Sequence, residues 1–268
     1  MDKRFTIIDA HAHIYPAKIA AKAVAAIGDF YGLRMECRGT SDDLVASGSA
    51  IGVSKYIVHS AATSPAQVRA INDNIIRECR ARPGVFHGFG TLHPDLGDIE
   101  GEIDYMLANG LLGIKLHPDF QKFAVDDPKA GRMYAAASGR MPILFHAGDR
   151  RFGYSNPSRI AAVADRFPDL AIIAAHFGGY SEWEDAERLL YRRGIYFDTS
   201  SSLFALDPAR AAEMIRAAGV EKFLFGSDFP MWGHEGEFAR FMRLPLSDGE
   251  RAAILAGNAL RLFPSLAD

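Results

Sequence analysis

Eight short apolar runs rich in β-forming residues recur along the chain, and each is followed by a stretch with helical spacing. Alternation of this kind is typical of β-α units, whose strands lie side by side in a parallel sheet. The eight runs are residues 5–10, 55–59, 85–91, 112–116, 142–146, 170–175, 194–199 and 222–226. Start and stop signals between the runs predict helices over residues 65–80, 157–167 and 208–218, with Asn156 as the cap of the second.

Two folds accommodate eight such units, a closed barrel and an open doubly wound sheet. The open sheet would bind a nucleotide through a glycine-rich turn after its first strand. Here the first strand leads into the segment Asp9-Ala10-His11-Ala12-His13, and no glycine-rich phosphate-binding motif follows any other predicted strand. The length of 268 residues is also close to the ~250 residues typical of an eight-fold barrel. We therefore expect an α/β protein with a single distorted (β/α)8 TIM barrel.

The first connection is too long for a minimal barrel. Residues 16–53 separate the first two predicted strands, and they should contain an inserted helical element. Helices are predicted over residues 18–30 and 42–49. We interpret this insert as a lid over the barrel mouth.

The sequence also predicts a helix beyond the eight β-α units of a barrel. Residues 247–263 predict an extra C-terminal helix, which starts at a capping box formed by Ser247 and Glu250. No Pro/Ser/Gly-rich linker, low-complexity segment or charge block interrupts the sequence. Residues 1–268 are therefore predicted to form one domain.

Charge and cysteine content narrow the classes of partner. Thirty Lys+Arg against 33 Asp+Glu give a net charge of −3 without a basic run, so we expect a small-molecule substrate and neither nucleic acid nor membrane. The cysteines Cys37 and Cys79 lie far apart, which fits a reducing compartment. Asp9 and His11 interrupt the first apolar run, so no signal-peptide core is expected, and no run approaches the ~20 apolar residues of a membrane span. We therefore expect a cytoplasmic protein.

Most of the histidines lie at the ends of predicted strands. Seven of the nine occur at or just past a carboxyl end, namely His11, His13, His59, His93, His117, His146 and His176. In a β/α barrel these ends converge on the face that carries the active site. His11 and His13 are two residues apart, so strand alternation points both into the mouth, where two imidazoles can share one cation.

Three further strands end in groups that can bind a metal, namely His146, His176 and Asp228. Crowding four imidazoles and an unpaired carboxylate together would cost desolvation free energy, which a bound metal removes. The sequence therefore predicts a metal centre. By contrast, the tetrapeptide Leu-His-Pro-Asp occurs twice, at residues 92–95 and 116–119. We assign its prolines and aspartates to turns and helix caps, and leave its histidines, with His59, as pocket lining.

These motifs resemble those of the amidohydrolase superfamily, and within it the branch called amidohydrolase family 2, which contains hydrolases and non-oxidative decarboxylases. The resemblance spans nearly the whole chain. It rests on residues 9–16 (DAHAHIYP), 113–118 (GIKLHP), 146–148 (HAG), 176–179 (HFGG), 196–200 (YFDTS) and 226–230 (GSDFP). This combination is specific for the superfamily and poorly specific for one reaction.

The resemblance implies a role for each of these side chains. His11 and His13 would bind a divalent metal, and His146 would be the third protein ligand. Asp228 would complete the shell or hold the attacking water, and His176 would act as general acid or base. A bound cation lowers the pKa of its water toward ~7, and a neighbouring carboxylate can accept the proton. Zinc suits these ligands best, with manganese as the alternative.

The number of metal ions depends on Lys115. In some superfamily members a lysine of the fourth strand is carboxylated and bridges two metals. Lys115 and His176 would then also be metal ligands, and His146 would move to the second ion. We expect one metal, since the family 2 branch favours it, and keep two as the alternative.

The predicted substrate-binding residues follow the fifth and eighth strands. Arg150, Arg151 and Tyr154 suit a carboxylate, and Trp232 would form a wall for the ligand. We therefore expect a metal-dependent hydrolase of a small, carboxylate-bearing ester, lactone or amide. The first alternative is a non-oxidative, metal-dependent decarboxylase of an unsaturated or aromatic acid, and the second is a non-catalytic metal or ligand binder. Relatives of this type often associate, which suggests a homodimer.

Overall fold

The strands form an eight-stranded parallel sheet that runs in chain order from β1 to β8. They are β1 (Ile7–His13), β2 (Val53–His59), β3 (Phe86–Thr91), β4 (Gly113–Leu116), β5 (Ile143–Phe145), β6 (Ile172–Ala174), β7 (Tyr196–Asp198) and β8 (Phe223–Leu224). Each strand overlaps one of the predicted runs. The computed structural model, which describes residues 5–267, therefore confirms the predicted (β/α)8 TIM barrel.

The barrel closes where β1 meets the segment that follows β8. The backbone N–H of Ala10 donates to the carbonyl of Phe225 at 2.8 Å, and that of His13 donates to the carbonyl of Phe229 at 2.7 Å. A parallel bridge also pairs Ala12 with Phe229. These contacts join the first and last strands of the sheet.

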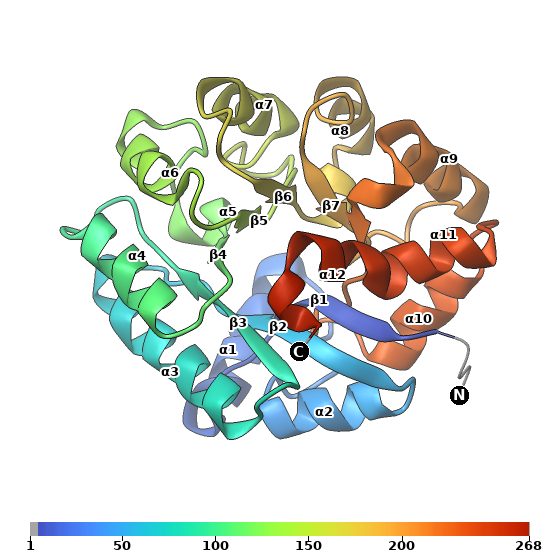
Figure 1. The fold of residues 1–268 in the computed structure, drawn as a ribbon, viewed down its shortest axis with the longest axis horizontal. Coiled ribbons are helices and arrows are strands. Elements are labelled where there is room, and N and C mark those ends of the chain that lie inside the picture. Colours follow the sequence, from blue (N-terminus) through green and yellow to red (C-terminus); the bar gives the residue numbers. More distant parts are fainter. Residues whose placement is uncertain (1–4, 268) are drawn as a thin grey trace.

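Helices surround the strands, as Figure 1 shows. They are α3 (Val68–Ala81), α4 (Ile99–Ala108), α5 (Pro118–Gln121), α6 (Gly131–Ala137), α7 (Pro157–Arg166), α8 (Trp183–Leu189), α9 (Pro208–Ala218) and α10 (His234–Met242). Asn156 is the N-cap residue of α7, as predicted, but its side chain makes no capping hydrogen bond. Its amide NH2 donates instead to the carboxylate of Glu182 at 2.8 and 2.9 Å.

The insert after β1 contains both predicted helices, α1 (Ala17–Tyr31) and α2 (Ser41–Ser49). Ile27 and Tyr31 of α1, together with Met35 after it, line a pocket that also contains histidines from the strand ends. The insert therefore covers the mouth of the barrel, as predicted. Whether it moves as a lid stays a prediction.

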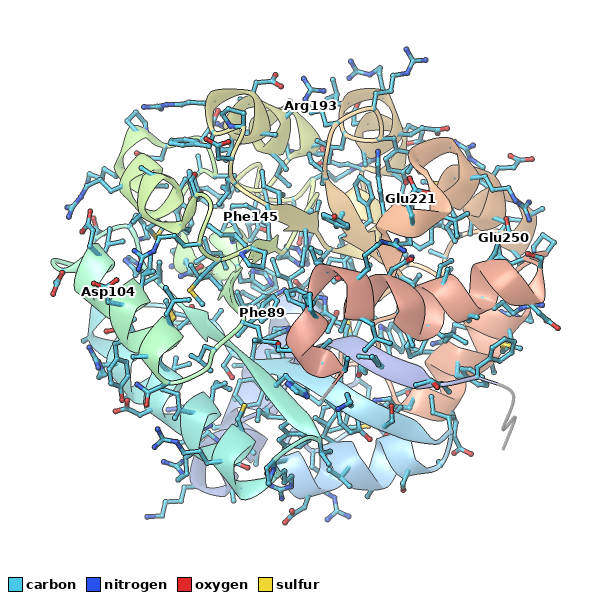
Figure 2. All side chains as sticks on the ribbon, in the orientation of Figure 1. Phe89, Asp104, Phe145, Arg193, Glu221 and Glu250 are labelled. Atoms are coloured by element: carbon cyan, nitrogen blue, oxygen red, sulfur yellow. The ribbon has the colours of Figure 1, made fainter. Side chains whose placement is uncertain are left out.

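The C-terminal segment closes the other end of the barrel. It consists of α11 (Asp248–Ala252), a π-helical turn (Ala253–Gly257) and α12 (Asn258–Leu262). The predicted capping box of Ser247 and Glu250 is present. Phe263 packs on Phe89 at 5.5 Å between ring centroids, inside an apolar cluster with Ile8 of β1. Figure 2 shows Phe89 near the centre of the barrel, beside this segment. The strand carboxyl ends are therefore the end available for a site.

Some predictions concern the chain termini. Residues 1–4 and 268, which the predicted domain includes, lie outside the described residues, as does part of the segment used for the signal-peptide prediction. Between residues 5 and 267, no helix combines the length and apolar character needed to cross a membrane.

Candidate metal centre and active site

The two histidines of β1 face the pocket because the strand changes register before it ends. Ile8 and Ala10 belong to the apolar cluster inside the barrel. Strict alternation would then turn Ala12 inward. The pairing of β1 with β2 shifts its register just before Ala12, and His11 and His13 line the pocket instead.

His11, His13 and Asp228 bring three possible ligand atoms together. His11 Nε2 lies 3.3 Å from His13 Nε2 and 3.3 Å from Asp228 Oδ1. His13 Nε2 lies 3.4 Å from the same carboxylate oxygen. Asp228 reaches this position in a left-handed conformation, with φ of 57°, while its backbone N–H donates to the carbonyl of His11 at 2.9 Å.

This triangle fits a divalent metal ion. Nitrogen and oxygen ligands at about 2.0–2.1 Å from a tetrahedral ion lie about 3.3–3.4 Å apart, which matches the three separations. Burial lowers the pKa of His13 to about 4, so its ring is neutral at pH 7. Burial alone would raise the pKa of Asp228, but His11, His13 and His176 hold it below its ordinary value. The site therefore offers the neutral imidazole of His13 and a carboxylate, groups that a cation requires, beside the ring of His11.

A buried carboxylate orients His11. Asp198, at the end of β7, accepts a hydrogen bond from His11 Nδ1 at 2.8 Å. The proton of the ring is thereby held on Nδ1, which leaves Nε2 free to bind a metal. Asp198 lies in the family motif at residues 196–200, but the sequence alone assigns it no role. Its position at the carboxyl end of a strand is the signal that would have found it.

His59 joins this cluster although the sequence assigns it only to the pocket lining. Its ring centroid lies 4.4 Å from that of His13 and 4.9 Å from that of His11. The possible ligand atoms of the three rings lie within 4.8 Å of one another. Neither ring nitrogen of His59 has a hydrogen-bond partner among the described residues. His59 is therefore a further candidate ligand.

His146 and His176 form a second pair in the same pocket. His146 Nδ1 lies 3.0 Å from His176 Nε2, and His176 Nδ1 lies 3.1 Å from the carbonyl oxygen of Ser200. Burial lowers the pKa of His176 to about 4. His146 thus contacts His176, while its Nε2 has no hydrogen-bond partner in the described part of the chain. Its role as third metal ligand stays a prediction.

Lys115 lies next to the triangle. Its side chain is fully buried, and its Nζ is 3.1 Å from His11 Nε2. Burial lowers the pKa of this amine to about 8, against the opposing effect of Asp228 and Asp198. This position accommodates both a free amine beside one metal and the predicted bridging lysine.

An aromatic wall faces these polar groups. His117 and Phe120 stack with 3.7 Å between ring centroids and an angle of 8°. The hydroxyl of Tyr31 lies 3.0 Å from His117 Nε2. The space between these side chains is about 330 Å³ when its opening to solvent is included, and the part that a water molecule can occupy is about 20 Å³.

The predicted substrate-binding residues are not part of this pocket lining, and their role stays a prediction. They are Arg150, Arg151, Tyr154 and Trp232, and the pocket lining found within residues 5–267 includes none of them. Arg150 is exposed. Arg151 donates to the carboxylate of Asp149 and to the carbonyl of Phe30. Side-chain partners of this kind depend on the path of the loops, which the local sequence does not determine.

Trp232 is linked to Asp228 of the metal-binding triangle through Ser201. Its indole N–H donates to Ser201 Oγ at 2.9 Å. The hydroxyl of Ser201 in turn donates to Asp228 Oδ2. Trp232 and Ser201 therefore hold one oxygen of Asp228, and the other oxygen faces His11 and His13.

Asp119 is not the turn residue that the sequence predicts. Its carboxyl is buried and accepts a hydrogen bond from Ser155 Oγ at 2.6 Å. The cap of α5 is His117, whose ring accepts the backbone N–H of Phe120. Burial raises the pKa of Asp119 to about 6. The prediction failed because α5 begins at Pro118 and places Asp119 in its buried first turn.

Comparisons with known proteins agree with this architecture. A family model described as amidohydrolase matches residues 8–265. No curated protein sequence matches the chain.

Solved structures share its fold at low sequence identity. An uncharacterized TIM-barrel protein from Bordetella bronchiseptica has a TM-score of 0.80 and 20% identity, covering 98% of this chain and 100% of that one. A dihydroxybenzoic acid decarboxylase from a Polaromonas species, with bound manganese and the inhibitor 2-nitroresorcinol, has a TM-score of 0.74 and 16% identity, covering 97% of each chain. A putative 2-pyrone-4,6-dicarboxylic acid hydrolase from Pseudomonas putida has a TM-score of 0.70 and 19% identity, covering 97% of this chain and 98% of that one.

Proposed function

Because the chain belongs to the amidohydrolase family, we propose that it is a metal-dependent hydrolase of a small, carboxylate-bearing ester, lactone or amide. The observation that carries this proposal is the triangle of His11 Nε2, His13 Nε2 and Asp228 Oδ1, with separations of 3.3–3.4 Å. These residues would hold the ion, with His146 as the predicted third protein ligand. When bound, a divalent metal activates water and polarises a substrate carbonyl.

Asp228 is the proposed general base. Its Oδ1 would hold the ion together with His11 and His13, and its Oδ2, which accepts a hydrogen bond from Ser201, would take the proton of the attacking water. The proton then passes to the leaving oxygen or nitrogen as the acyl bond breaks. His176 is the proposed acid-base partner, since its ring lines the same pocket as Asp228, with 5.2 Å between its centroid and that of His11.

Decarboxylation of an aromatic or unsaturated acid is the second candidate. The specific observation in its favour is the aromatic lining of the pocket by His117 and Phe120, against whose ring edges an aromatic substrate can pack. The manganese-containing decarboxylase among the similar structures supports the same reaction. The same decarboxylase supports manganese as the alternative metal. The nitrogen-rich ligand set favours zinc.

Elemental analysis and product assays together test these proposals. We expect about one metal ion per chain, and a value that Lys115→Ala leaves unchanged. A value near two that falls in the variant would support the bridging lysine instead. Acid release from lactones and esters supports hydrolysis, and CO2 release from aromatic or muconate-type acids supports decarboxylation. A protein that binds no metal after exposure to zinc or manganese would contradict both.

A further inference from the structure

The inserted helix α1 brings a hydroxyl group to the pocket. Tyr31, the last residue of α1, lines this pocket together with His117. Its hydroxyl lies 3.0 Å from His117 Nε2. This hydroxyl makes no other hydrogen bond among residues 5–267. Whether it donates to His117 or accepts from it depends on which ring nitrogen of His117 carries a proton.

The protonation of His117 follows from its surroundings. The backbone N–H of Phe120 donates to His117 Nδ1 at 3.3 Å, so Nδ1 must be the unprotonated nitrogen. A histidine ring whose Nδ1 is unprotonated is neutral. A neutral ring with a free Nδ1 carries its proton on Nε2. His117 Nε2–H therefore donates to the oxygen of Tyr31.

The ring of His117 is held in this orientation. It is stacked between Phe120, at 3.7 Å and 8°, and His146, at 4.0 Å and 7°. Its backbone N–H donates to Gln121 Oε1 at 2.8 Å. The amide of Gln121 also donates to the carbonyls of Ala62 and Leu92, in the loops after β2 and β3. The donor to Tyr31 is thus fixed by three barrel loops.

Tyr31 is held from the other side by Arg151. The guanidinium group lies 5.2 Å from the Tyr31 ring centroid and 5.1 Å from that of Phe30. It also donates to the carbonyl of Phe30 at 2.9 Å, while Asp149 binds its other nitrogens. Arg151 therefore positions the end of α1, although the sequence assigns it to substrate binding.

A tyrosine oxygen that accepts a hydrogen bond leaves its own O–H free to donate. We propose that the Tyr31 hydroxyl is the donor that recognises a carboxylate oxygen of a small planar acid in this pocket. The rings of His117 and Phe120 line the pocket and offer their edges to an aromatic body, and the amine of Lys115 favours an anion. The inference rests on the proposed function, because it assigns a specificity residue to the same site.

Calorimetric titration of the metal-loaded protein tests this role. The probes are benzoate and nitrobenzene, which have nearly the same shape and differ in charge. Replacing Tyr31 by Phe keeps the ring and removes the donor. We expect Tyr31→Phe to weaken benzoate binding about tenfold or more, since hydrogen bonds to charged groups are the stronger ones. Nitrobenzene binding should change less than twofold.

The matched control is Tyr180→Phe. The ring of Tyr180 lies 5.3 Å from that of Tyr31, but Tyr180 is absent from the pocket lining found in residues 5–267. This variant should bind benzoate as the wild type does. Near-ultraviolet circular dichroism confirms that both variants keep the aromatic cluster packed.

Three results would overturn the inference. They are equal benzoate affinity in the wild type and Tyr31→Phe, an equal loss in Tyr180→Phe, and no benzoate binding by the wild type. The same experiments distinguish a failure of this inference from a failure of the proposed function. A metal-loaded protein that binds benzoate through Tyr31 and hydrolyses no ester, lactone or amide contradicts only the hydrolase. An active hydrolase whose Tyr31→Phe variant binds benzoate normally contradicts only the inference.

Discussion

At the scale of single residues, the candidate site depends on carboxylates that hold histidines in one tautomer. Asp198 illustrates this, because its bond to His11 Nδ1 at 2.8 Å leaves Nε2 as the nitrogen that faces His13 and Asp228. An amide in its place could present its NH2 group to His11 and allow the proton to move to Nε2. The carboxylate thus acts on the metal site without lying within the triangle.

We therefore predict that Asp198→Asn weakens metal affinity by about 10–100-fold, the usual cost of losing such a partner. Competition with a chromogenic chelator measures the change in Kd. Asp165→Asn is the control, since Asp165 is a surface carboxylate paired with Arg193. Equal metal affinity in wild type and Asp198→Asn would contradict the assigned role.

Glu237 is a buried carboxyl that makes stability depend on pH. Burial raises its pKa to about 8, although Arg240 opposes the rise. The folded chain therefore binds a proton that the unfolded chain releases near pH 4.5. The stabilisation from this proton is complete below about pH 4.5, falls as the pH rises, and is lost above about pH 8.

The variant Glu237→Gln removes this titration and keeps the shape of the side chain. Between pH 5 and 8, the free energy of unfolding of the wild type should fall relative to the variant by up to about 1.4 kcal/mol per pH unit. Urea denaturation at pH 5, 6.5 and 8 measures both. Parallel pH profiles for the two proteins would show that Glu237 does not titrate as described.

At the scale of helices and strands, local signals predict most of the architecture. The capping box at Ser247 is an example, because both of its hydrogen bonds lie within four residues of sequence. We predict that Ser247→Ala lowers the free energy of unfolding by about 1 kcal/mol. Chemical denaturation should show this loss, whereas Ser49→Ala, an exposed site at the end of α2, should change stability by less than about 0.5 kcal/mol. Equal losses of unfolding free energy in Ser247→Ala and Ser49→Ala would mean that the capping box makes no specific contribution.

The elements that could not be predicted depend on contacts between distant segments. Alternation in β1 correctly predicts that His11 and His13 face the same way, but the register shift that turns them inward after Ala10 involves the pairing with β2. Likewise, Tyr31 enters the pocket because the end of α1 packs against loops after β4 and β5. Neither residue type nor spacing in the insert indicates that contact. For this reason the sequence identifies the metal-binding candidates and His117 of the pocket wall, but neither Tyr31 nor Phe120.

At the scale of the whole molecule, the candidate metal centre lies across the closure of the barrel. His11 and His13 belong to the first strand, and Asp228 follows the last one. Backbone hydrogen bonds join these two segments directly, such as Ala10 N–H to Phe225 and Asp228 N–H to His11, and the carboxylate of Asp9 accepts hydrogen bonds from the N–H and hydroxyl of Ser227. An ion held by both segments would therefore link the two ends of the sheet.

We predict that metal removal destabilises the entire fold and loosens this closure first. A ligand present at about 1,000 times its Kd stabilises a protein by about 4 kcal/mol, so chelation should lower Tm by several degrees. Hydrogen exchange should rise most at β1 and residues 225–229, and least at β4 and β5 on the far side of the barrel. The double variant His11→Ala/His13→Ala should show neither change on chelation. A uniform rise in exchange would mean that the ion does not join the first and last strands, and an unchanged Tm would mean that binding is not coupled to folding.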